Sequence, residues 1–158
     1  MKFLTIATLW IGMVMIQPGV AHSLDDARAL SGLTSVRAIF DVRTGEEKTL
    51  QFIFTTIRDT LDATMQQDVK PHYVVSMRGP TVKLLIRSRH GDAELQEKTN
   101  KLIGELNQRG VRLEACSYAL NLFGLEAEDL VDGIHAVGNS LNSIIAYQIK
   151  GYALVPMN

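Results

Sequence analysis

The strongest constraint on the fold of this chain is the alternation of short apolar runs with longer segments of helical period. Five runs are rich in β-branched and aromatic residues and are bounded by turn-forming residues, as strands are. They span residues 36–42, 72–77, 111–115, 134–137 and 152–155, and helical segments lie between them at 46–67, 93–109 and 140–150. Strands that alternate with helices form parallel βαβ units. The sequence therefore predicts an α/β fold, a three-layer α/β/α sandwich around a mainly parallel five-stranded sheet.

The spacing of apolar residues predicts which side of each helix faces the sheet. In the segment 46–67 the apolar positions recur every three or four residues, which predicts one buried stripe: Leu50, Ile53, Phe54, Ile57, Leu61 and Met65. In the segment 140–150, Leu141, Ile144 and Ile145 are predicted to point inward. Residues 81–86 fit either a strand or a helical turn, and Pro80 before them favours the helix. Residues 117–123 and 126–130 are predicted to be two further short helical pieces.

The N-terminus has the features of a secretory signal peptide. Lys2 supplies the positive charge, an apolar stretch runs from Leu4 to Ile16, and small residues precede a cleavage site after Ala21. As a helix this stretch spans about 20 Å, short of the roughly 30 Å hydrocarbon core of a membrane. We therefore expect residues 1–21 to be a cleaved signal peptide, with the mature protein periplasmic and not inserted in the membrane. Residues 22–35 then form an N-terminal arm, and residues 36–158 form the folded domain.

Length and charge limit the classes of partner. The 158 residues suit a single domain with a sizeable core. Sixteen basic and 17 acidic side chains give a formal charge of −1, and removal of residues 1–21 takes away only Lys2. A nucleic-acid partner is not expected, because binding to phosphates usually requires an excess of positive charge.

The single cysteine, Cys116, is the first candidate for chemistry. It follows the predicted strand 111–115, and Ser117 begins the next helical piece. A lone cysteine cannot close an intrachain disulfide, although an exported chain normally carries paired thiols. At a strand end beside a helix start, backbone N–H groups favour the thiolate, whereas a buried cysteine is usually an inert packing residue. A disulfide to another molecule is the third interpretation, and between the reactive and the packed thiol position alone does not decide.

Four other residues could support a reactive Cys116, and Ser117, at the start of the next helical piece, is one of them. Arg78 and Asn139 follow predicted strands and so are expected at the same edge of the sheet, and His90 is a candidate base. These three also have plainer interpretations: a solvated loop arginine, a helix cap and a surface histidine. Motifs for dinucleotide, phosphate-loop or hydrolase sites are missing, and the histidines lack the spacing of metal ligands. No cofactor and no metal are therefore expected.

Four segments resemble the DsrE/DsrF-like family of small sulfur-relay proteins: residues 77–85, 110–116, 125–134 and 148–153. The resemblance implies a flavodoxin-like α/β/α fold and a persulfide held on a cysteine that matches Cys116. It also implies a homo-oligomer, a trimer or hexamer. The chain departs from the family in two ways: many relatives act in cytoplasmic heteromeric assemblies, and many carry histidine at the position of Arg78.

Two hypotheses for function follow. In the first, the protein is a periplasmic sulfur carrier of sulfurtransferase type. Its Cys116 accepts sulfane sulfur from a donor protein or small thiol, holds it as a persulfide and passes it to an acceptor. In the alternative, the protein is a non-catalytic binding or assembly subunit in which Cys116 is structural.

Overall fold

A five-stranded sheet organises the molecule. The computed structural model describes residues 26–158, so the predicted signal peptide and residues 22–25 of the arm lie outside the described residues. The strands are β1 (Ser35–Val42), β2 (Lys70–Met77), β3 (Arg112–Cys116), β4 (Ile134–Val137) and β5 (Ala153–Met157). Their order is β4-β3-β2-β1-β5, and every neighbouring pair is parallel. All five predicted strands are present, which confirms the predicted sheet.

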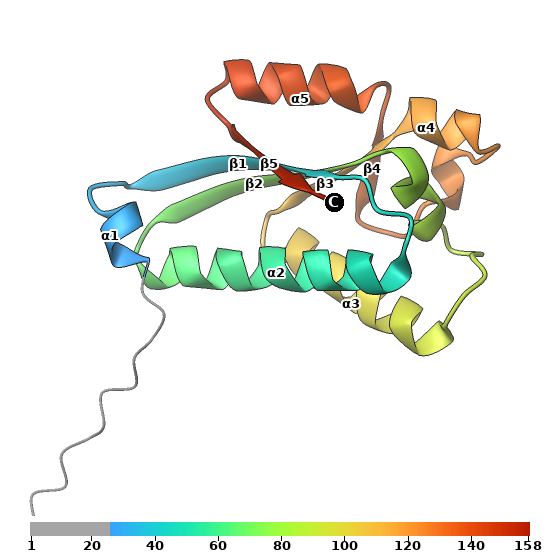
Figure 1. The fold of residues 1–158 in the computed structure, drawn as a ribbon, viewed down its shortest axis with the longest axis horizontal. Coiled ribbons are helices and arrows are strands. Elements are labelled where there is room, and N and C mark those ends of the chain that lie inside the picture. The colour runs from blue at the N-terminus through green and yellow to red at the C-terminus, as the bar shows by residue number, and fades with distance from the viewer. Residues whose placement is uncertain (1–25) are drawn as a thin grey trace, which may run out of the picture.

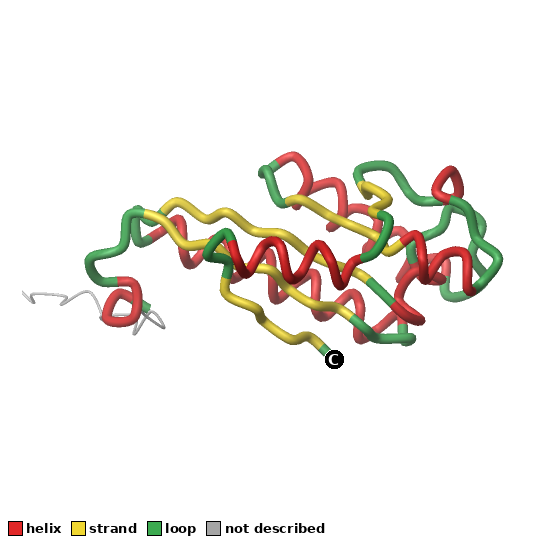
Figure 2. Tube along the Cα trace, turned by 90° about the horizontal axis from the view of Figure 1, so that it is seen from above, coloured by secondary structure: helices red, strands yellow, loops and turns green. Residues whose placement is uncertain are grey.

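Helices cover both faces of this sheet, as predicted for a three-layer sandwich. The long helices α2 (Glu47–Gln66) and α3 (Ala93–Gln108) pack side by side on one face. Helix α5 (Ser140–Ile149) lies on the opposite face, with strands visible on both sides of it when the sheet is seen from above (Figures 1 and 2). Shorter elements complete the chain: α1 (Ala27–Leu30), α4 (Ser117–Leu122) and the 3₁₀ helices η1 (Gly79–Leu84) and η2 (Ala127–Asp129).

Helix α2 buries the stripe that its sequence predicts, with one exception. Five of the six predicted positions are at most 3% exposed, whereas Met65 is 52% exposed, so its prediction was wrong. At 3.6 residues per turn the position that follows Leu61 on the buried side is Thr64. Thr64 is buried, and its hydroxyl shares a 2.8 Å hydrogen bond with the Tyr73 hydroxyl. A hydrogen-bonded threonine therefore closes the stripe where an apolar residue was expected.

Helix α5 also exposes apolar residues that were predicted to be buried. Ile144 packs against the sheet at 6% exposure, but Leu141 and Ile145 are 50% and 55% exposed, so their predicted inward orientation was wrong. Only the narrow side that carries Ser140 and Ile144 reaches the sheet. The outer side of α5 therefore exposes apolar side chains to solvent.

Capping residues and turns set the remaining boundaries. The Asp92 carboxylate accepts hydrogen bonds from the N–H groups of Glu94 and Leu95 and so begins α3. The favoured helical turn at residues 81–86 is present only in part. The 3₁₀ helix begins earlier, at Gly79 with φ +59°, and ends at Leu84, whereas Ile86 forms an isolated antiparallel bridge with Leu130. Pro80 occupies its first turn, where the missing N–H costs nothing.

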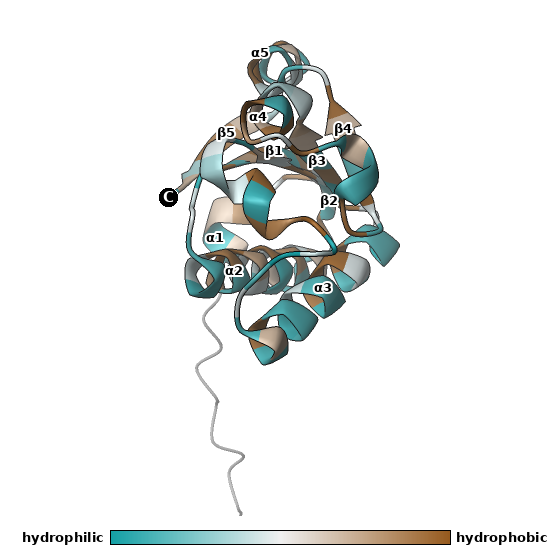
Figure 3. Ribbon diagram, turned by 90° about the vertical axis from the view of Figure 1, so that its right-hand side faces the viewer, coloured by the Kyte–Doolittle hydropathy of each residue, from teal (hydrophilic) through white to brown (hydrophobic). Residues whose placement is uncertain are grey.

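The carboxyl ends of β1 to β4 meet at one edge of the sheet. Figure 3 looks onto this edge, where α4 lies beside the beginning of α5. The Tyr118 N–H donates to the Gly138 carbonyl, at 3.2 Å, and ties the two helix starts together. No helix among residues 26–158 is long and apolar enough to span a bilayer. The fold thus gathers the segments after β2, β3 and β4 around one small region of surface.

Candidate functional site

Cys116 is the last residue of β3 and lies at this edge of the sheet. Its Sγ atom accepts a hydrogen bond from the backbone N–H of Ser140, the first residue of α5, with the two atoms 3.5 Å apart. The residue is 4% exposed, but it lines a pocket of about 270 Å³. The thiol is therefore recessed within a surface pocket.

The segments after three strands supply the walls of this pocket. They contribute Arg78 and Gly79 after β2, Tyr118, Ala119 and Leu122 from α4, and Asn139, Ser140 and Leu141 at the start of α5. Most of this lining is apolar. Such a site can hold a small group directly against the sulfur and keep bulk water away from it.

Two opposing effects set the pKa of the Cys116 thiol. Burial raises the pKa, because the thiolate loses its hydration. The Ser140 hydroxyl and the backbone N–H groups of Ser140, Ala119 and Tyr118 lower the pKa, because they lie close enough to the sulfur to stabilise the thiolate, and together they outweigh burial. The net pKa lies below the ordinary value of 9.0. The site therefore favours the nucleophilic form of the sulfur.

Ser140 is placed to respond to the charge on this sulfur. It is fully buried, and its Oγ atom has no partner within ordinary hydrogen-bond geometry among residues 26–158. A hydroxyl hydrogen rotates freely, so the Ser140 hydroxyl can turn toward the sulfur when the thiolate forms.

Arg78 is held at the pocket by a buried acid. Its Nε and terminal nitrogen donate to the two carboxylate oxygens of Asp41, at 2.8 and 2.9 Å. This pairing raises the pKa of the Arg78 guanidinium, and the Cys116 thiolate adds a smaller electrostatic contribution in the same direction. By reciprocity the guanidinium favours the thiolate. Because Asp41 already balances it, Arg78 brings little net charge to the pocket.

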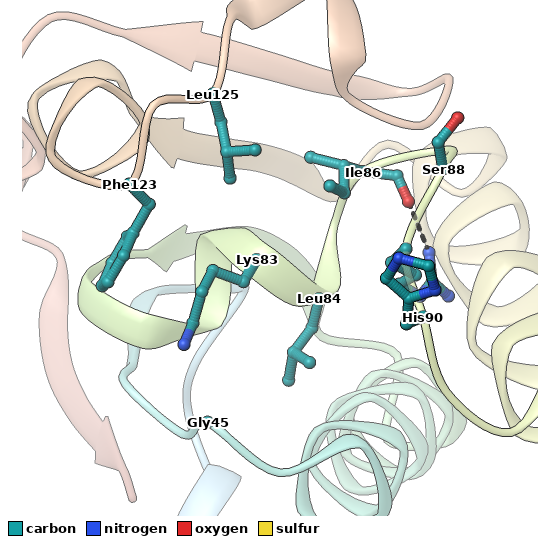
Figure 4. A pocket seen from close by; sticks show the side chains of 9 residues that line it. Gly45, Lys83, Leu84, Ile86, Ser88, His90, Phe123 and Leu125 are labelled. Carbon is teal, nitrogen blue, oxygen red and sulfur yellow. Dashed lines mark hydrogen bonds between the residues drawn. The ribbon is translucent and has the colours of Figure 1, made fainter.

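The other predicted supporting residues take different places. Asn139 lines the pocket and caps α5, because its side-chain oxygen accepts from the Leu141 N–H at 2.9 Å. Ser117 begins α4 but does not line the pocket, and the hydroxyl beside the sulfur belongs to Ser140. His90 lines a separate pocket of about 330 Å³ with Lys83 and other residues (Figure 4). The structure thus brings Arg78 and Asn139 to Cys116, and it does not bring His90 there.

A buried carboxylate lies on the same strand and the same face as Cys116. Glu114 is 2% exposed, and its Oε1 atom accepts from Arg112 and from the Tyr147 hydroxyl of α5. Burial and this hydrogen bond raise the pKa of Tyr147 to about 12. The Tyr147 contact fastens the C-terminal half of α5 to β3, and Ser140 at the start of the same helix meets the sulfur at the end of that strand.

Sequence reasoning missed two residues of the site. Asp41 lies in the buried second half of β1, among Ile39, Phe40 and Val42, and an acid at such a position signals a buried ion pair. Ser140 directly follows Asn139, whose presence helix capping is enough to explain. No local sequence pattern therefore indicated that the Ser140 hydroxyl lies beside the sulfur. Among the described residues no cluster of three or more histidine, cysteine or acidic side chains could hold a metal ion.

We expect alkylation of Cys116 to report its lowered pKa. The rate of reaction with iodoacetamide, measured against pH, should rise with a midpoint below 9.0. In Ser140→Ala the midpoint should move upward, because the variant keeps the backbone N–H but loses the hydroxyl. Ser117→Ala is the matched control and should leave the midpoint unchanged. A midpoint at or above the ordinary value in the unaltered protein would contradict the described environment of the sulfur.

Comparison with known proteins places the chain in a family. The model of the DsrE/DsrF-like family matches residues 37–157, which is nearly the whole described domain. The chain belongs to this family. The predicted family is thereby confirmed, and members of the DsrE/DsrF-like family generally act in sulfur relay.

Solved structures share the fold of this DsrE/DsrF-like protein. One is a protein of unknown function, MTH1491, from Methanobacterium thermoautotrophicum, with 22% sequence identity and a TM-score of 0.63 over 77% of this chain and 98% of that one. Another is the ychN protein of E. coli, with 14% identity and a TM-score of 0.53 over 78% of this chain and 98% of that one. A search of curated proteins finds no match. These likenesses confirm the α/β fold class.

Proposed function

We propose that this DsrE/DsrF-like protein is a periplasmic sulfur carrier, exported by residues 1–21, in which Cys116 holds sulfane sulfur as a persulfide. The observation that carries the proposal is the position of the Cys116 sulfur. It lies in a pocket at the strand ends, receives a hydrogen bond from the Ser140 N–H, and has a lowered pKa. Membership of a family that generally acts in sulfur relay supports it.

The transfer step needs only groups that the site and the donor supply. The Cys116 thiolate attacks the outer sulfur of a donor persulfide, R–S–SH, and forms a new S–S bond. The S–S bond of the donor breaks, and R–S⁻ leaves with the electron pair, so no external oxidant or reductant is required. The reverse attack, by the thiolate of an acceptor on the Cys116 persulfide, delivers the sulfur and restores the thiolate. The chain has no second cysteine that could discharge the persulfide internally.

Intact-mass spectrometry of protein recovered from the periplasm tests export and sulfur loading together. The mass should correspond to a chain that begins at His22. After exposure to thiosulfate or polysulfide it should increase by one sulfur atom, and a reducing thiol should remove that atom. Cys116→Ser should gain none. If no donor gives an adduct on the folded protein, the alternative applies: a non-catalytic assembly subunit with a structural cysteine.

A further inference from the structure

The pocket that contains His90 has a basic lining. Its volume is about 330 Å³, within the range of about 300–1,000 Å³ that is typical of ligand sites. Of its nine lining residues three are basic, Lys83, Arg89 and His90, and none is acidic. Gly45 follows β1 and Lys83 lies in η1 after β2, so the pocket lies at the carboxyl edge of the sheet, where open parallel sheets bind ligands. The lining therefore favours an anion.

Arg89 shapes a wall of this pocket but is not free to balance the charge of a ligand. Its side chain is only 4% exposed, and its Nε atom lies 3.4 Å from a carboxylate oxygen of Glu47. Its terminal nitrogens donate to the Ile86 carbonyl, at 3.0 Å, and to the side-chain oxygen of Asn100, at 3.1 Å. The ion pair with Glu47 balances the guanidinium, and these bonds hold the segment 86–90 in place.

Lys83 is the cation that remains unbalanced. It is exposed, and among residues 26–158 its ammonium forms no hydrogen bond and no ion pair with an acid. The Nζ atom lies 4.9 Å from the centroid of the Phe123 ring, so a cation–π contact holds the side chain at the pocket. This contact restrains the ammonium without neutralising its charge. A ligand with a negative group can therefore pair with Lys83 at a small loss of side-chain entropy.

The rest of the lining is mostly apolar. In Figure 4 the side chains of Leu84 and Ile86 lie between Lys83 and Phe123 on one side and His90 on the other. An inorganic anion would gain nothing from this apolar floor, and it would lose part of its hydration there. An organic anion would bury its apolar body on the floor, and this burial favours binding.

We propose that this pocket binds a small organic carboxylate, with the carboxylate at the Lys83 ammonium and the apolar body against Leu84 and Ile86. The inference does not rest on the proposed function. Helix η1 separates this pocket from that of Cys116, because Gly79 at the start of η1 lines the Cys116 pocket and Lys83 near its end lines this one. The chain therefore has a second site, for a ligand that need not carry sulfur.

Benzoate, benzamide and sulfate test the two requirements of the site separately. Benzoate has a carboxylate and an apolar ring, benzamide has nearly the same shape without the charge, and sulfate has charge without an apolar body. Two-dimensional ¹H–¹⁵N NMR titrations of the protein measure the affinity of each and locate it by the amides that shift. We expect benzoate to shift amides of residues 83–90 and to bind about tenfold more tightly than benzamide, because its bond to Lys83 is charge-assisted. Sulfate should bind more weakly than benzoate.

Matched lysine variants assign the preference to Lys83. Lys83→Met keeps an apolar side chain beside Phe123 but removes the charge, so it should lower the affinity for benzoate to that for benzamide. Its affinity for benzamide should not change. Lys101→Met, on α3, removes another exposed lysine that does not line this pocket, and it should bind all three probes as the unaltered protein does. Both lysines are exposed, so we expect both variants to fold.

The outcomes decide the inference without reference to Cys116. Equal affinities for benzoate and benzamide, an equal loss in the two lysine variants, or benzoate shifts confined to residues outside the lining would overturn it. Sulfate binding as tight as benzoate binding would indicate a site for inorganic anions and would also overturn it. No shift with benzoate at millimolar concentrations would do the same. The rate of Cys116 alkylation tests the proposed function separately, so either proposal can fail while the other stands.

Discussion

Arg78→Ala is expected to destabilise the protein by about 2–4 kcal/mol at neutral pH. The Asp41 side chain is only 8% exposed, and removal of Arg78 takes away both of its close charged hydrogen bonds. The remaining cation, Arg43, is 3.6 Å from the carboxylate and is itself 42% exposed, so it compensates poorly. This expected loss of stability is somewhat smaller than the cost of breaking a fully buried ion pair, because the Arg78 side chain is 26% exposed. Urea denaturation measures the difference directly.

Arg43→Ala is the matched control for that measurement. It removes a cation from the same carboxylate but leaves the two-bonded pair with Arg78 intact, and we expect a loss of at most about 1 kcal/mol. Equal losses in the two variants would contradict the arrangement around Asp41. Arg78→Ala should also slow the alkylation of Cys116, because the guanidinium favours the thiolate.

Phe54→Ala is expected to cost about 3–5 kcal/mol of unfolding free energy. Phe54 is fully buried in the cluster between α2 and the sheet, and truncation to alanine leaves a cavity that rigid neighbours cannot fill. Phe52→Ala, two residues earlier on the same helix, makes the same chemical change at a side chain that is 69% exposed. It should change the stability by less than about 0.5 kcal/mol.

The contrast between these two phenylalanines tests the orientation of α2. Both substitutions lower the side-chain volume equally and have the same effect on helix propensity, so only burial distinguishes them. Similar losses in urea denaturation would mean that α2 is rotated relative to the sheet. The same rotation would displace Thr64 from Tyr73, whose hydroxyls are 2.8 Å apart in the described fold.

Local patterns in the sequence were enough to predict the sheet, the three layers and the edge of the sheet on which Cys116 lies. Buried strands are visible in the sequence as short apolar runs, and helices as apolar residues with a period of 3.6. In a parallel sheet all the carboxyl ends of the strands share one edge. The exceptions came where burial depends on neighbours far away in the chain. Met65 and Ile145 have the hydrophobicity of core residues, yet the sheet offers no surface opposite them, and both are exposed.

The candidate site also has features that residue order predicts and features that only the tertiary structure determines. The placement of Cys116 at a strand end, and of Arg78 and Asn139 after neighbouring strands, followed from the order of residues alone. Only the tertiary structure decided that Asp41 pairs with Arg78, that the hydroxyl beside the sulfur belongs to Ser140 and not to Ser117, and that His90 lies in another pocket. Hydrogen bonds and ion pairs act over about 3 Å between residues tens of positions apart. Their partners become defined only when packing has brought the strand ends together.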